Sequence, residues 1–168
     1  IVLGGALATM DGVFGSGMHI AMHAMGKITL FFCAGAIFVA THKKNVSELD
    51  GLGRTMPFTI SAFFLGSISI IGLPPTGGAW SKWYLALGAA EGHHAVFIAV
   101  LMVSSLLSIG YLMPIVGRAF FFSSSEKQPA QSGGLAGFWA GIEEAPLLCV
   151  FPLCLTAAGC VLLFFYAP

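Results

Sequence analysis

The chain has 168 residues, of which 57% are hydrophobic and only 8% are charged, and its seven basic and seven acidic residues cancel. Soluble domains carry charge on about a quarter of their residues, so this composition excludes an ordinary soluble fold and favours a chain that is solvated by lipid. The balanced charge also excludes the basic surface that nucleic-acid binding requires.

The apolar segments predict an all-α polytopic membrane protein, because about 20 apolar residues in a helix cross a bilayer. Residues 1–8 are expected to be the tail of one helix, and Asp11 with Gly12 to form a turn. The chain begins within an apolar run and without Met, so we expect the C-terminal part of a larger subunit. Residues 1–168 are expected to form one membrane domain with spans at about 15–41, 57–90, 94–117 and 145–166.

The segment 57–90 is too long for one straight span, and residues 72–78 in its middle read GLPPTGG. Proline removes a backbone donor and clashes with the preceding turn, so this sequence is expected to break the helix. We expect half-helices at about 57–73 and 76–90. Unwound backbone persists in lipid only where it is buried or lines a wet cavity, so the break points to an ion or substrate site. The backbone of this expected site is Pro74, Pro75, Gly77 and Gly78.

The distribution of basic residues predicts the orientation of the chain. Three Lys or Arg residues lie in 42–56 and two in 118–144, whereas none lies near 91–94. The positive-inside rule therefore puts the first two loops, with Lys43 and Lys127, in the cytoplasm. Glu143 and Glu144 are expected at the start of the last span, where the helix dipole favours an anion.

Ionisable residues inside the apolar runs are the candidate functional groups. His19, His23 and Lys27 are four residues apart, which aligns them on one face of a helix. A lysine at the bilayer centre costs about 2.5–3.5 kcal/mol, so an idle one is not expected there. Lys82 is a second such amine, just after the break. Lysines that bind and release protons, with histidines between them, would form a proton relay.

Less specific interpretations of these residues stay open. His19 and His23 could bind a metal, but no third ligand is apparent. His19 could be an interfacial residue without a role, and Lys27 and Lys82 could belong to permanent ion pairs. The four cysteines lie in apolar runs without CxxC spacing, so neither a zinc site nor a disulfide framework is expected.

Two of these segments resemble a known family. Residues 19–31 resemble the H-x3-H-x3-K-x2-LF signature of proton-conducting antiporter subunits, which include large membrane subunits of respiratory complex I and Mrp-type cation/proton antiporters. Residues 51–57 are similar to the loop that follows, and residues 72–84 resemble its broken helix, G-[LI]-P-P-x-x-G-F-x-x-[KE]. Ala79 departs from that pattern, where Phe is usual. Within the family, SKWY at 81–84 and YLMPIV at 111–116 look closest to the D-type subunit of the Mrp antiporters.

The resemblance implies a fold with two inverted helical repeats, of which this chain would hold most of the second repeat and the last helix. It implies proton translocation in a monovalent cation/proton (Na+/H+) antiporter complex, with other membrane subunits as partners and no cofactor. Lys27 and Lys82 would hold protons, and His19 and His23 would relay them.

The alternative is a proton-pumping subunit of an NADH–quinone oxidoreductase or a membrane-bound hydrogenase, without a redox centre of its own. A different class, a membrane scaffold without transport, is disfavoured by the two mid-membrane lysines. The protein is thus expected to be a transporter subunit rather than an enzyme, in the bacterial inner membrane.

Overall fold

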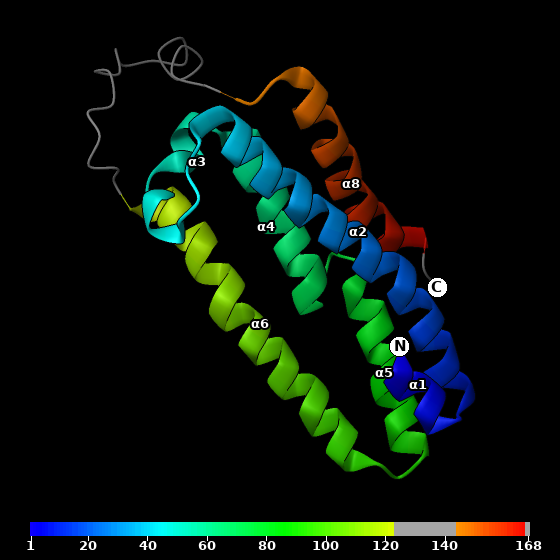
Figure 1. The fold of residues 1–168 in the computed structure, drawn as a ribbon. Coiled ribbons are helices and arrows are strands. Elements are labelled where there is room, and N and C mark those ends of the chain that lie inside the picture. Colours follow the sequence, from blue (N-terminus) through cyan, green and yellow to red (C-terminus); the bar gives the residue numbers. More distant parts are fainter. Residues whose placement is uncertain (123–143, 167–168) are drawn as a thin grey trace.

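The computed structural model describes residues 1–122 and 144–166, and the regular elements in these ranges are all helices (Figure 1). Three of them are long and apolar enough to cross a membrane: α2 (Met10–Thr41), α6 (Ala95–Phe121) and α8 (Leu147–Tyr166). The expected all-α membrane bundle with a broken helix is therefore confirmed. The elements are α1 (Val2–Leu7), α2 (Met10–Thr41), the 3-10 turn η1 (Val46–Glu48), α3 (Leu52–Thr55), α4 (Pro57–Ile71), α5 (Gly78–Glu91), α6 (Ala95–Phe121) and α8 (Leu147–Tyr166).

Helix α2 begins earlier than the sequence suggested. The chain turns at Ala8, whose φ is 51°, and Thr9 then caps the helix by accepting a hydrogen bond from the backbone N–H of Gly12 at 3.2 Å. Asp11 lies in the first helical turn, where the helix dipole favours a carboxylate. The expected turn at Asp11 and Gly12 was therefore wrong, because the threonine cap places the reversal before these residues.

Helix α2 packs against α4, α5 and α8, and the two half-helices α4 and α5 follow one another between α2 and α6 (Figure 1). Glycines permit the closest approach of α2 to α5. A Cβ at Gly15 would lie 2.9 Å from the backbone nitrogen of Leu85, and one at Gly88 would lie 2.5 Å from that of Gly12. Small residues at a helix crossing are a common way to pack spanning helices.

The expected helix break is confirmed, with slightly different limits. Helix α4 ends at Ile71, Gly72 adopts a left-handed conformation with φ of 84°, and α5 begins at Gly78. The Thr76 hydroxyl donates to the carbonyl of Leu73 at 2.7 Å, and the N–H of Gly77 donates to the carbonyl of Cys160 in α8 at 3.0 Å. These peptide groups of the unwound segment thus form hydrogen bonds within the protein, as a membrane environment requires.

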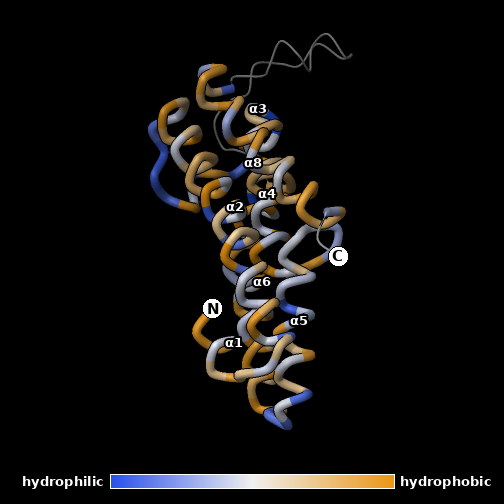
Figure 2. The backbone as a smooth tube through the Cα atoms, turned by 90° about the vertical axis from the view of Figure 1, so that its right-hand side faces the viewer, coloured by the Kyte–Doolittle hydropathy of each residue, from blue (hydrophilic) through white to orange (hydrophobic). Residues whose placement is uncertain are grey.

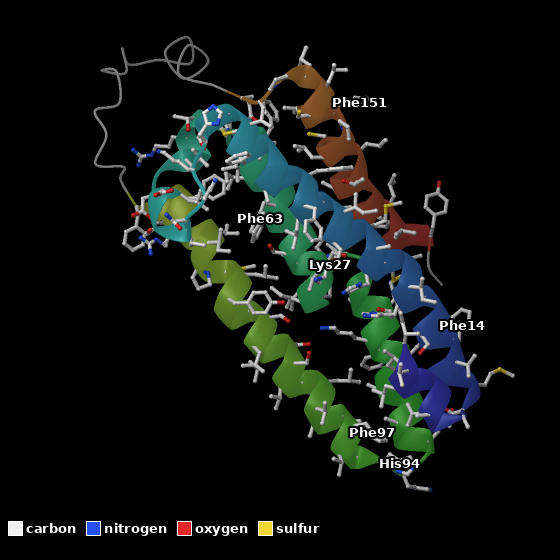
Figure 3. All side chains as sticks on the ribbon, viewed as in Figure 1. Phe14, Lys27, Phe63, His94, Phe97 and Phe151 are labelled. Atoms are coloured by element: carbon white, nitrogen blue, oxygen red, sulfur yellow. The ribbon has the colours of Figure 1, made fainter. Side chains whose placement is uncertain are left out.

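Polar contacts close the end of the bundle where α2 finishes. Arg118, near the end of α6, binds Asp50 through two hydrogen bonds of 2.8 and 3.1 Å. Figure 2 shows that hydrophilic residues gather toward both ends, with largely hydrophobic helices between them. The segment between α2 and α3 and the end of α6 lie at one end of the bundle (Figure 1), and the α5–α6 connection with His94 lies at the other (Figure 3).

The position of Glu144 corrects a sequence prediction. Its carboxylate accepts hydrogen bonds from the N–H of Phe58 at 2.7 Å and from the hydroxyl of Thr59 at 2.6 Å. Glu144 therefore caps α4 and not the last helix, which begins at Leu147. The reason is that α4 starts with uncapped N–H groups close to the chain that enters α8. Glu143 and Lys127 lie outside the described residues.

Candidate proton-translocation site

The histidines of α2 stand on one face of the helix, as their spacing predicted. The rings of His19 and His23 are 5.3 Å apart between centroids and tilted by 32°. Both side chains are half-buried. Two imidazoles one turn apart offer consecutive groups that can accept and release a proton.

A serine links this histidine pair to the broken helix. The Nδ1 atom of His19 lies 2.9 Å from the hydroxyl oxygen of Ser81, which is fully buried. The Ser81 hydroxyl also lies 3.1 Å from the carbonyl of Gly78, to which it donates. A hydroxyl has one proton to donate, so in this arrangement the Nδ1–H of His19 is the donor to Ser81. Ser81 therefore connects α2 to the first turn of α5.

The amine of Lys82 is held at the end of α4. Its Nζ donates to the carbonyl of Ile71 at 2.7 Å and to the hydroxyl of Ser105 in α6 at 2.8 Å. The last carbonyls of a helix carry partial negative charge, which attracts an ammonium group. A Cβ on Gly72 would lie 2.7 Å from Cδ of Lys82, so this glycine leaves the space for the lysine stem. The helix break thus creates the position that Lys82 occupies.

Lys27 is placed differently from Lys82. It projects from the middle of α2, near the level of the α4–α5 break, and is exposed in this chain (Figure 3). Among the described residues it makes no hydrogen bond or ion pair. The structure therefore brings His19, Ser81 and Lys82 to neighbouring positions around the start of α5 but leaves Lys27 on an open face.

The four backbone residues expected at the break fall into two groups. Pro74 and Pro75 are exposed, and the peptide bond between them is cis. Gly77 and Gly78 are buried. A Cβ on Gly78 would overlap the carbonyl oxygen of Ser69, so the two half-helices meet at a place where no side chain fits. Gly72 ends α4, the two prolines lie in the unwound segment, and Gly78 lets the start of α5 approach the end of α4 closely.

The two histidines were also considered as metal ligands. Within residues 1–122 and 144–166, no group of three or more His, Cys, Asp or Glu side chains gathers closely enough to hold an ion. The chemistry that this arrangement does offer is proton exchange between amines, imidazoles and hydroxyls.

Sequence reasoning missed two polar contacts of this site. Ser81 stands beside Lys82 in the chain and one turn into the second half-helix, so its presence at the site could have been predicted from the sequence. Ser105 gave no such signal, because only the packing of α6 against α5 brings it to Lys82. A serine within an apolar helix is not by itself unusual.

These features define a polytopic helical membrane protein in which ionisable and hydroxyl groups surround a broken helix. Residues 1–108 match the family described as "NADH:quinone oxidoreductase/Mrp antiporter, TM", and the chain belongs to this family. It is an integral membrane protein, and the family resemblance of its sequence is confirmed.

The relatives include subunits of NADH-quinone oxidoreductases, of a Na(+)/H(+) antiporter and of a hydrogenase. The chain is 43% identical to the N-type subunit of the NADH-quinone oxidoreductase of Desulforudis audaxviator over 120 residues, which are 71% of this chain and 24% of that protein. It is 32% identical to the D-type subunit of the Na(+)/H(+) antiporter of Alkalihalophilus pseudofirmus over 121 residues, 72% of this chain and 24% of that protein. It is 36% identical to hydrogenase-4 component B of Escherichia coli over 78 residues, 46% of this chain and 12% of that protein. The matched part thus spans about a quarter of the first two relatives.

Proposed function

We propose that this chain carries part of a proton pathway across the membrane, as an antiporter-like subunit of a multisubunit complex. The observation that carries the proposal is the position of Lys82, whose amine lies between the end of α4 and Ser105. An amine in this place needs partners, and here they are neutral oxygens that hold the proton without trapping it in an ion pair. Membership of the family supports the same function.

The proposed pathway uses the groups of α2 and α5 in sequence. Lys82 holds a proton against the end of α4 and releases it when its surroundings change. The hydroxyl of Ser81, next to Lys82 in the chain, contacts His19, and His23 lies one turn further along α2. Protons therefore have a line of exchangeable groups between the break and the middle of α2, where Lys27 continues it.

The exposed position of Lys27 indicates that the chain has partners in the membrane. A charged amine facing lipid at mid-depth is costly, so in the assembled protein other polypeptide or a hydrated cavity covers this face. We propose other membrane subunits as partners, as the names of the relatives suggest, and a bacterial cell membrane as the location. The relatives named above are bacterial.

Two driving reactions are candidates for the complete complex. Exchange of protons for Na+ or another monovalent cation is supported by the similarity to the Na(+)/H(+) antiporter relative and by the SKWY sequence at 81–84. Quinone reduction in partner subunits is supported by the higher identity to the NADH-quinone oxidoreductase relative. Both use the same proton pathway in this chain. Vesicles that contain the complete complex distinguish them, because one would move protons on addition of Na+ and the other on addition of NADH and quinone.

The proposed pathway itself is tested by removing its amines. Lys82→Ala and Lys27→Ala, each made in the complete complex, are expected to abolish proton flux while the complex still assembles. Lys44→Ala is the matched control, because Lys44 lies in the exposed loop after α2. Equal flux in Lys82→Ala and Lys44→Ala would contradict the proposal.

A further inference from the structure

Helix α6 carries three serines close together, Ser104, Ser105 and Ser108, and they differ in what they contact. Ser105 is half-buried, and its hydroxyl lies 2.8 Å from Nζ of Lys82 although the two residues are 23 positions apart. Its neighbour Ser104 is exposed, and Ser108 donates to the carbonyl of Ser104 at 2.9 Å within the helix. Ser105 is thus the serine of this segment that contacts a side chain of the proposed pathway.

We propose that Ser105 is the positioning residue of Lys82, holding the amine in place in both its charged and its neutral state. This inference rests on the proposed function. The carbonyl of Ile71 can only accept a hydrogen bond, so it pairs with an N–H of the lysine and nothing else. A hydroxyl can accept from the ammonium form and donate to the neutral amine. Ser105 therefore keeps a hydrogen bond to Lys82 throughout a cycle of protonation.

The surroundings of Lys82 make this hydroxyl important. In the described part of the chain, the ionisable side chains that interact electrostatically with Lys82 are His19 and His23, both on α2. Helix α4 faces it with the carbonyl of Ile71, and α6 faces it with Ser105. Within residues 1–122 and 144–166, the hydrogen bonds of the amine thus go to two neutral oxygens, and Ser105 supplies one of them. Its loss would leave the half-buried ammonium with the carbonyl of Ile71 as its one acceptor among the described residues, which disfavours the charged form.

The experiment compares Ser105→Ala with Ser104→Ala in vesicles that contain the complete complex, with proton flux measured across a range of pH. Ser105→Ala is expected to move the pH profile to lower pH by about one unit, because the hydrogen bond lost from the charged amine is stronger than the one lost from the neutral amine. Ser104→Ala is expected to match the wild type. Ser105→Thr keeps the hydroxyl and is expected to restore the wild-type profile. The amount of assembled complex is measured for every variant.

Each outcome bears on the inference. A shifted profile in Ser105→Ala that Ser105→Thr restores supports the positioning role. Loss of flux without a shift, unrestored by threonine, overturns it and indicates a packing role. Identical profiles for Ser105→Ala and Ser104→Ala overturn it as well, while loss of flux in Lys82→Ala would leave the proposed function intact. Normal flux in Lys82→Ala overturns the proposed function and this inference together.

Discussion

The closest contact between the two half-helices provides a sharp test of the broken-helix geometry. At Gly78 a Cβ would overlap the carbonyl oxygen of Ser69 and would lie 3.4 Å from Cα of Gly72. These obstacles are backbone atoms, which cannot rotate away as a side chain can. Gly78→Ala should therefore push α5 away from α4 and displace Lys82, which lies one turn further along α5.

The size of this effect follows from the packing. Forcing an extra methyl group into a filled site costs about 1–3 kcal/mol, and a backbone obstacle favours the upper end of this range. A cost of this size should lower the melting temperature by several degrees. Gly17→Ala is the control, because a Cβ at Gly17 would point into open space. Alanine also has the better helix propensity, so Gly17→Ala should be neutral or slightly stabilising.

The assay is thermal unfolding of the purified complex in detergent or nanodiscs, combined with proton flux in vesicles. Gly78→Ala is expected to unfold at a lower temperature than Gly17→Ala and to lose flux. Equal melting temperatures and equal flux in the two variants would refute the close approach of the half-helices at Gly78.

Three further predictions concern the ends of the bundle. Glu144→Gln keeps the shape of the side chain but weakens the charge-assisted cap on α4, so we expect a loss of about 1 kcal/mol in unfolding experiments; an unchanged stability would contradict the cap. The hydrogen bond from Arg118 holds the pKa of Asp50 below its ordinary value, so the pair stabilises the fold above the unfolded-state pKa, and this contribution is lost as the pH falls through the lower folded-state pKa. Asp50→Asn should remove that part of the acid dependence of the melting temperature, and an unchanged dependence would argue against the pair. Cysteines introduced at Lys43 and His93 should react with impermeant reagents from opposite sides of the membrane; reaction from one side only would contradict the alternating topology.

The features that local sequence determines were predictable. Prolines and glycines at 74–78 act on their own turn of backbone, so the break was predicted to within about two residues at either side. The four-residue spacing of His19 and His23 placed them on one helix face for the same reason. Family membership was also predictable, because the signature residues lie close together in the sequence.

The features that depend on tertiary packing were not predictable. Glu144 was assigned to the helix that follows it in the chain, whereas it caps α4, which begins 87 positions earlier. Ser105 reaches Lys82 only because α6 packs against α5. The start of α2 was missed for a local reason, because Asp11 and Gly12 favour turns by composition while Thr9 supplies the cap.

The claim that the lysines carry mobile protons is tested most directly by replacing them with arginine. Arginine keeps the positive charge but does not release a proton at physiological pH, so it preserves a purely structural role of the charge and prevents a protonation cycle. The measurement is proton flux in vesicles that contain the complete complex with Lys82→Arg or Lys27→Arg, at matched amounts of assembled protein. Our account predicts loss of flux in both variants, and retention of some flux in Lys82→Glu, because a carboxylate can also bind and release a proton. Near-normal flux in both arginine variants would contradict it.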